Sequence, residues 1–187
     1  MTKGLRMLDD MVMSVTGAVA ACELGATLPH EHLLIDLRNQ FTPFADPERE
    51  RVSREPVGPA HRARLMDNPY ALRDNLVLDD EALAARELAA FAALGGRTVV
   101  DCTSVGIGRN PAGLRRLALE TGLTIIAGTG WYTADTHAPG LAEQTVEELA
   151  ERMVRELMVG MDGTDIRAGV IGELGTSRTI EPGERTI

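Results

Sequence analysis

Segments typical of strands and segments typical of helices alternate strictly through the second half of the chain. The helix-like segments span residues 79–96, 110–122 and 145–161. The strand-like segments are short and rich in β-branched residues, and they span residues 97–104, 123–130 and 166–175. This alternation predicts a parallel sheet with helices packed outside it, because parallel strands need long crossover connections.

Residues at the ends of the helix-like segments support this interpretation. Asn110 is a good N-cap, Pro111 suits the first helical position, and Gly122 suits the stop. Thr145 and Glu148 have the spacing of a capping box. The helices are therefore predicted from local signals as well as from the alternation.

The strand-like segments are apolar without a clean alternation, which is typical of strands buried on both faces. An earlier apolar segment, residues 28–36, adds a first strand to the set. Two α/β architectures fit this order. One is an open doubly wound sheet, and the other is the first half of a (β/α)8 barrel.

The first part of the chain is less regular. Residues 11–27 indicate an N-terminal hairpin with turns at Gly17 and Gly25. Residues 38–77 are polar and contain five prolines, which predicts a long loop with short helical pieces. We expect one domain over residues 1–187, in which βα units occupy residues 28–187.

Charge and cysteine content exclude several classes of protein. With 19 basic and 28 acidic residues, the net charge of −9 argues against nucleic acid and membrane surfaces as partners. Cys22 and Cys102 are too few for a disulfide framework, so a cytoplasmic location is expected. A competing interpretation is a lipoprotein cleavage site ending at Cys22, but Asp9 and Asp10 stand where export signals carry positive charge.

Two histidines stand one residue apart inside the first predicted strand. In a strand, residues i and i+2 project to the same face, so His30 and His32 would point the same way. Two imidazoles close together in a core are costly unless something shares their lone pairs, and a zinc ion can do so. Hydrogen-bonded histidines at a strand end are the alternative explanation.

Glu173 is a carboxylate in the otherwise apolar segment AGVIGELGTS. A buried glutamate is rare unless it is paired or bound to a metal. Taken alone, an exposed strand end with an arginine partner is the more common explanation. In parallel α/β folds, however, the carboxyl ends of the strands share one mouth, which would bring Glu173 to the histidine pair.

Weaker candidates follow the second strand. Asp101 could orient a neighbouring ligand or cap a helix, and Cys102 is expected to be a buried thiol. Gly106 and Gly108 lack the third glycine of a dinucleotide fingerprint, because Pro111 stands in its place.

Other weak candidates lie in predicted loops. Trp131 and Tyr132 follow the third strand, where they could line the mouth or pack in the core. His61 in the polar loop is expected to be solvated, and His137 lines the mouth or lies in a solvated loop.

The segment GATLPHEHL, from Gly25 to Leu33, resembles the signature of the phosphotriesterase-like family in the amidohydrolase superfamily. That signature has glycine, threonine and leucine at fixed positions before His-Glu-His and an aliphatic residue. The similarity continues through NPYALRDNLVLDD, TVVDCTSVGIGRN, GTGWY and IRAGVIGELGTS. It covers nearly the whole chain in the expected order.

The resemblance implies a (β/α)8 barrel with two divalent metals at the carboxyl ends of the strands. In the family, the histidine pair of strand one binds a metal, so His30 and His32 are the implied ligands, with zinc the expected ion. A carboxylated lysine or a glutamate on strand four bridges the metals, and Glu173 occupies that position. Because Lys3 is the single lysine, the glutamate version is implied.

The implied activity is hydrolysis of a small ester, lactone, amide or phosphotriester by a hydroxide that bridges the metals. Glu173 would be a catalytic residue as the bridging ligand. Family members with a tyrosine after GTG and one further residue often act on lactones. Tyr132 matches that tyrosine and is the second implied catalytic residue.

The sequence departs from the family by ending at Ile187, after the fourth predicted strand. The family places two more histidines on strands five and six and an aspartate on strand eight, so the chain resembles the N-terminal half of a barrel truncated after strand four. We expect the isolated chain to be poorly soluble and a weak or inactive hydrolase, with unpaired sheet edges that could join in a homodimer. The alternative function is a non-catalytic remnant that binds at most one metal.

Overall fold

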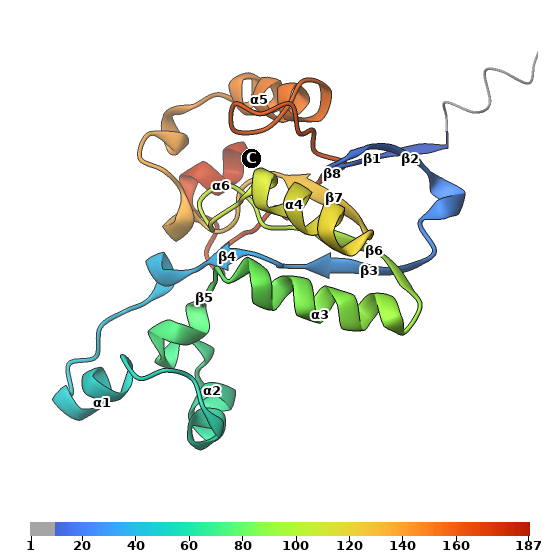
Figure 1. Cartoon of the computed structure of the whole chain (residues 1–187). Coiled ribbons are helices and arrows are strands. Elements are labelled where there is room, and N and C mark those ends of the chain that lie inside the picture. Colours follow the sequence, from blue (N-terminus) through green and yellow to red (C-terminus); the bar gives the residue numbers. More distant parts are fainter. Residues whose placement is uncertain (1–9) are drawn as a thin grey trace, which may run out of the picture.

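Four parallel strands form the central sheet of the computed structural model, which describes residues 10–187. Lys3 and Asp9 lie outside the described residues. The strands follow one another in the order β3 (Ala26–Glu31), β6 (Gly96–Asp101), β7 (Thr124–Thr129) and β8 (Val170–Ile171) (Figure 1). This order follows the sequence without the reversal that defines a doubly wound sheet. The sheet is therefore the four-stranded parallel half-barrel that the resemblance implied.

Backbone pairing brings the carboxyl ends of these strands to one edge of the sheet. Glu31 pairs with Asp101, and Asp101 pairs in turn with Ala127. Thr129, at the end of β7, pairs with Ile171. Side chains that follow the strand ends consequently share one mouth.

Three helices pack against the sheet, and they span Glu81–Ala93 (α3), Pro111–Thr121 (α4) and Val146–Met158 (α5). The expected end signals are present. The Asn110 side chain accepts the Gly113 N–H, Gly122 ends α4 with a φ of 72°, and Thr145 and Glu148 form the predicted capping box. Within residues 10–187, no helix combines the length and apolarity needed to cross a bilayer.

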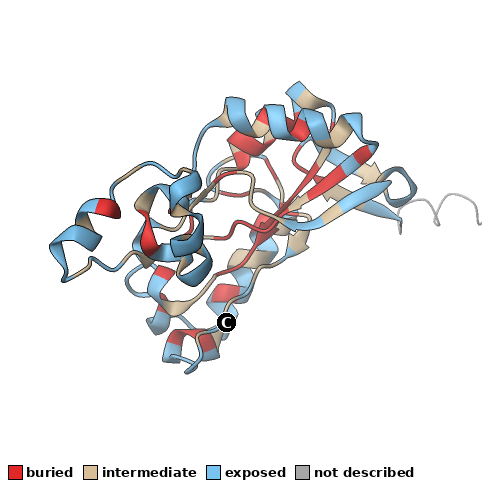
Figure 2. Ribbon diagram, turned by 90° about the horizontal axis from the view of Figure 1, so that it is seen from below, coloured by how far each residue is buried: buried red, intermediate tan, exposed pale blue. Residues whose placement is uncertain are grey.

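The main core lies between the two central strands and the helices α3 and α4. Leu88, Val99, Leu114, Leu117 and Ile125 are each at most 3% exposed. Figure 2 shows buried residues concentrated along the strands and on the helix faces turned toward them. Burial on both faces of β6 and β7 explains their continuous apolar sequences.

An antiparallel hairpin packs on the amino-terminal end of the sheet. Its strands are β1 (Met11–Ser14) and β2 (Gly17–Ala20). Val15 at its turn is fully buried and donates its N–H to the Ile125 carbonyl. The hairpin is thus tied to the start of β7, at the end of the sheet opposite the mouth.

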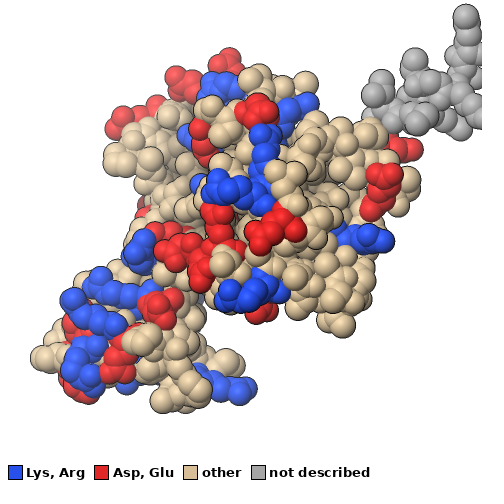
Figure 3. Space-filling model, in the orientation of Figure 1, with Lys and Arg blue, Asp and Glu red and all other residues tan. Residues whose placement is uncertain are grey.

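The polar segment between β4 (Ile35–Asp36) and β5 (Val77–Leu78) projects from the mouth end of the molecule (Figure 1). It contains the short helices α1 (Pro47–Val52) and α2 (Arg62–Asp67) together with single 3-10 turns. Basic and acidic side chains are mixed over its surface (Figure 3). Exposed ion pairs such as Arg51 with Glu48 and Glu55 stabilise it only weakly.

Several elements are shorter than predicted. The first strand was expected over residues 28–36, but β3 ends at Glu31. The fourth strand was expected over residues 166–175, but β8 contains two residues, because the chain leaves the ladder at Gly172, where φ is 145°. The last helix was expected to reach residue 161, but α5 ends at Met158, and Gly160, with a φ of 157°, begins a tight turn.

Candidate metal centre

Two imidazoles and one carboxylate converge at the mouth of the half-barrel. His30 lies in β3, His32 lies just beyond the end of that strand, and Glu173 lies two residues beyond β8. His30 Nε2 is 3.1 Å from Glu173 Oε2, and His32 Nε2 is 3.5 Å from Glu173 Oε1. The three side chains form a group whose ligand atoms all lie within 4.8 Å of one another.

The group is open to solvent on one side. The exposed fraction of the side chain is 53% for His30, 27% for His32 and 19% for Glu173. The two imidazole rings meet edge to face, with centroids 5.4 Å apart. A small molecule could therefore approach the group from the mouth.

Backbone contacts fix Glu173 although it lies outside the strand. Its N–H donates to the Cys102 carbonyl across the end of the sheet. Gly128 permits this path, because a Cβ there would lie 1.8 Å from the Gly172 oxygen. The carboxylate is therefore held by its own main chain and by a close approach to β7.

A second set of contacts fixes His32 from behind. Thr103 Oγ1 lies 3.0 Å from His32 Nδ1. Asp101 Oδ1 accepts the Thr103 N–H, and Asp101 Oδ2 accepts the Leu33 N–H. Burial raises the pKa of Asp101, whereas the hydrogen bonds from Leu33 and Thr103 act in the opposite direction.

The donor set fits a divalent metal. Zinc bonds to histidine nitrogen and carboxylate oxygen are about 2.0–2.2 Å long, so neighbouring donors around a tetrahedral ion stand about 3.4 Å apart. The two nitrogen–oxygen separations here are 3.1 and 3.5 Å. Nitrogen donors favour zinc over magnesium or calcium. The same distances also permit ion pairs if the imidazoles are protonated.

Tyr132 stands beside this group. Burial raises the pKa of its phenol, and the charge of Glu173 raises it further, followed by effects of Tyr70 and Asp135. The ring packs against Gly175, where a Cβ would lie 2.7 Å from Tyr132 Cδ2. The hydroxyl therefore remains protonated at neutral pH, and its catalytic role stays a prediction.

The histidines of the loops lie elsewhere and differ from expectation. The prediction of a solvated His61 was wrong, because its side chain is 15% exposed and its Nε2 lies 3.1 Å from a Glu55 oxygen. His137 is half-buried, and its Nε2 lies 2.7 Å from the Tyr132 carbonyl oxygen. Local polar partners, which loop composition does not reveal, hold both rings.

The remaining candidates have structural roles. Trp131 packs in a core cluster and is 2% exposed, so it does not line the mouth. Cys102 is a buried thiol as predicted, and burial followed by the Glu173 charge raises its pKa to about 11. Asp101 caps no helix but binds two backbone N–H groups. Gly106 and Gly108 form a turn with positive φ.

Sequence reasoning missed two residues near the mouth. Thr103 was not singled out, although it lies two residues after Asp101 within the predicted strand 97–104. Tyr70 was also overlooked, because it belongs to the irregular segment before β5, yet it is close enough to affect the pKa of Tyr132. The position of Thr103 near the carboxyl end of a strand could have drawn attention to it, whereas no local signal marks Tyr70.

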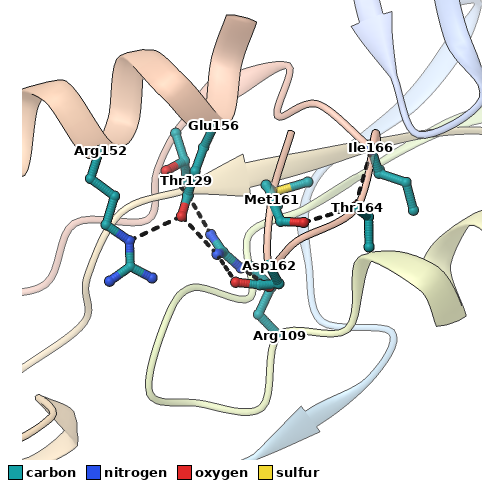
Figure 4. A network of polar contacts seen from close by, with 8 residues as sticks. All are labelled: Arg109, Thr129, Arg152, Glu156, Met161, Asp162, Thr164 and Ile166. Carbon is teal, nitrogen blue, oxygen red and sulfur yellow. Dashed lines mark hydrogen bonds and ion pairs between the residues drawn. The ribbon is translucent and has the colours of Figure 1, made fainter. Parts of the chain in front are cut away.

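A buried ion-pair network braces the neighbouring part of the molecule (Figure 4). Arg109 donates two hydrogen bonds to Glu156 of α5 and also pairs with Asp162. Thr129, the last residue of β7, donates to the same glutamate. Burial would raise the pKa of Glu156, but these hydrogen bonds outweigh it and lower the pKa to about 2.

The fold is a four-stranded parallel half-barrel, which corresponds to the N-terminal half of the (β/α)8 architecture, and its mouth carries a possible metal-binding group of two histidines and one glutamate. The sequence pattern that describes the Phosphotriesterase family matches residues 10–187, so the chain belongs to this family of the amidohydrolase superfamily.

Relatives and solved structures agree with this assignment. N-acetyltaurine hydrolase from Danio rerio is 41% identical over 96% of this chain and 52% of its own length. A resiniferatoxin-binding protein from Rhodobacter sphaeroides has a TM-score of 0.90 and 38% identity, covering 95% of this chain and 49% of that one. For an organophosphorus hydrolase from Deinococcus radiodurans the TM-score is 0.64 and the identity 33%, over 95% and 47% of the two chains. The chain thus spans about half the length of the curated relatives it matches.

Proposed function

We propose that His30, His32 and Glu173 hold a divalent metal, zinc by preference, in a hydrolase of the phosphotriesterase family. The observation that carries this proposal is the convergence of two imidazole Nε2 atoms on the two oxygens of one carboxylate. The family assignment supports it, because the same fold supplies a common mouth for these groups.

The proposed substrate is a small molecule with a carbonyl or phosphoryl centre. Among esters, lactones, amides and phosphotriesters, an amide is favoured, because the relative with 41% identity is named for N-acetyltaurine, an amide. A phosphotriester is the second choice, because the Deinococcus protein is named an organophosphorus hydrolase. A lactone remains in the set because of Tyr132.

The residues of the chain have separable tasks in this chemistry. A bound divalent metal would polarise the substrate oxygen and lower the pKa of water. Glu173 presents one oxygen toward each imidazole, which suits a carboxylate that bridges two ions. Tyr132, kept protonated by burial and by Glu173, can donate a hydrogen bond to a substrate oxygen beside them.

A second function deserves a test because the chain covers about half of its relatives. The four-stranded unit could bind one metal without turnover, since the further ligands and the aspartate implied for strands five, six and eight do not belong to it. General-base loss typically lowers a rate by about 10²–10⁴-fold. Metal binding and hydrolysis are therefore separate questions.

Calorimetric titration of the metal-free chain with zinc answers the first question. We expect one bound ion, with binding lost in His30→Ala. His61→Ala is the matched control, because that histidine pairs with Glu55 in the polar segment between β4 and β5, and its loss should leave zinc binding unchanged. Equal zinc affinities of the wild type and His30→Ala would disprove the proposed site.

Hydrolysis assays on the zinc-loaded chain answer the second question. N-acetyltaurine, a lactone and an aryl phosphotriester should each be offered. Zinc-dependent turnover that is lost in His30→Ala supports the hydrolase. Zinc binding without turnover supports the metal-binding unit.

We also propose a cytoplasmic location and a homodimer. Cys22 and Cys102 are both free, which fits a reducing cytoplasm. In the described chain, β3 and β8 pair with a neighbour on one side only, so two copies could join along these edges as a homodimer.

A further inference from the structure

The two ring nitrogens of His32 face different partners. Nε2 faces Glu173 at 3.5 Å, on the side where the metal is proposed. Nδ1 faces the opposite way, 3.0 Å from Thr103 Oγ1. The ring is therefore held between the open mouth and a buried hydroxyl.

One carboxylate holds this arrangement from two directions. Asp101 accepts the Leu33 N–H at 2.7 Å and the Thr103 N–H at 3.0 Å. Both Asp101 and Thr103 are 1% exposed, so solvent has little access to their polar atoms. Because Leu33 follows His32 in the chain, Asp101 fixes both the backbone beside the imidazole and the residue behind its ring.

The position of the single proton on a metal-binding imidazole explains what the Thr103 hydroxyl can do. A neutral imidazole carries one proton, and the nitrogen that binds a metal must be without it. If Nε2 of His32 binds, the proton is on Nδ1 and needs an acceptor. Thr103 Oγ1 stands at hydrogen-bond distance from that atom.

We propose that Thr103 is a positioning residue for His32, an inference that rests on the metal site proposed above. Its hydroxyl oxygen accepts the Nδ1 proton and directs the Nε2 lone pair toward the metal position beside Glu173. Asp101 holds the threonine in this place. Partners of this kind typically change metal affinity about 10–100-fold when removed.

Zinc titration of hydroxyl variants tests the inference. Thr103→Val keeps the shape and removes the hydroxyl, so zinc affinity should fall about 10–100-fold. Thr103→Ser keeps the hydroxyl and should bind within about threefold of the wild type. Thr129→Val is the matched control, because Thr129 is equally buried at the end of β7 but donates to Glu156 instead of touching a histidine.

Nuclear magnetic resonance of labelled histidine provides a second readout that a general loss of packing would not move. The chain has four histidines, so the ring signals can be assigned from single variants. In the zinc-loaded wild type and Thr103→Ser, the Nδ1 proton of His32 should be slow to exchange with water. In Thr103→Val it should exchange too fast to be observed at the same zinc saturation.

The outcomes separate the two proposals. If the wild type and His32→Ala bind zinc equally, the metal site and the positioning role both fail. If His32→Ala loses zinc but Thr103→Val binds like the wild type, the positioning role alone is overturned. Equal losses in Thr103→Val and Thr103→Ser, or in Thr129→Val, would also overturn it, because packing instead of the hydroxyl would be responsible.

Discussion

Two glutamates near the mouth end of the sheet differ in how their oxygens are satisfied. Glu156 is 5% exposed and accepts hydrogen bonds from Arg109, Arg152 and Thr129 (Figure 4). Glu173 is 19% exposed and faces two imidazoles instead of fixed cations. Arginine is always charged, whereas an imidazole near neutral pH offers either a proton or a lone pair.

This difference separates a structural carboxylate from one available for a ligand. Guanidinium groups saturate Glu156, so nothing further can bind it without breaking the network. The two imidazoles and Glu173 are all satisfied at once by a divalent cation, which accepts lone pairs from each. Saturation by permanent charges is therefore a feature of a structural carboxylate, whereas the contacts of Glu173 with two imidazoles leave it able to share a cation with them.

The largest expected effect on stability comes from breaking the ion pairs of Glu156. Arg109→Ala removes the buried cation and leaves Glu156 without its main partner, which should cost about 3–5 kcal/mol of unfolding free energy. Denaturant unfolding of the metal-free chain measures this loss. Arg51→Ala, in the exposed pairs of α1, should cost far less and serves as the control. Similar losses of unfolding free energy in both variants would mean that the buried ion pairs of Glu156 stabilise the fold no more than exposed ones.

Glu173→Gln should weaken zinc binding strongly and change the stability of the metal-free chain little. Zinc affinity should fall at least about 100-fold, more than for typical partners outside the ligand set. The unfolding free energy of the metal-free chain should change by less than about 0.5 kcal/mol, because the side chain is partly exposed and no fixed cation is stranded. Calorimetry and denaturant unfolding on one sample give both numbers. A large destabilisation without zinc would mean that Glu173 is structural as well.

The next largest effect is the loss of stability in acid, where Glu156 becomes protonated. The pKa of Glu156 is lowered to about 2, below that of an unfolded glutamate near 4.5. A lowered folded-state pKa stabilises the fold above about pH 4.5, and this contribution is lost as the pH falls toward 2. Between pH 7 and pH 3 the loss should be about 2 kcal/mol. Glu156→Gln should have a flatter stability profile over this interval.

A second carboxylate contributes in the same pH window and must be separated. Hydrogen bonds from Ser177, Glu181 and Ala134 lower the pKa of Glu184 to about 2 against the effect of burial. Comparing Glu156→Gln with Glu184→Gln assigns the acid sensitivity to one group or the other. If neither variant changes the profile, the sensitivity arises elsewhere.

The regular half of the fold and the metal group were both accessible from the sequence. Helix caps at Asn110 and Thr145 act within a few residues, so local signals locate the helix ends. The meeting of His30, His32 and Glu173 was predicted from strand parity and from the shared edge of parallel strands, although His32 and Glu173 lie just beyond the ends of their strands. These are rules of backbone geometry, and they need no knowledge of packing.

Contacts between side chains far apart in the sequence could not be predicted from it. Thr103 meets His32 because β3 and β6 pair with a register shift between Leu28 and Glu31, which no sequence pattern announces. The Arg109–Glu156 pair joins residues 47 positions apart, and eighteen arginines offer many alternatives. Side-chain partners of this kind depend on the assembled sheet.

The smallest expected effect concerns the thiol beneath the metal group. Burial and then the charge of Glu173 raise the pKa of Cys102 to about 11, so little thiolate is present at pH 8 and alkylation should be slow. Cys22 is exposed and should react first. In Glu173→Gln the loss of one nearby charge should speed alkylation of Cys102 by no more than about tenfold, which corresponds to one pKa unit.

Mass spectrometry of the alkylated chain resolves the two thiols. Glu184→Gln is the control, because Glu184 is not among the groups that raise the pKa of Cys102. An unchanged rate in Glu173→Gln would place the charge of that glutamate too far from Cys102 to matter. A rate that rises in both variants would indicate opening of the sheet instead of an electrostatic effect. An acceleration confined to Glu173→Gln would show that this carboxylate is charged in the metal-free chain, and thus ready to bind a cation.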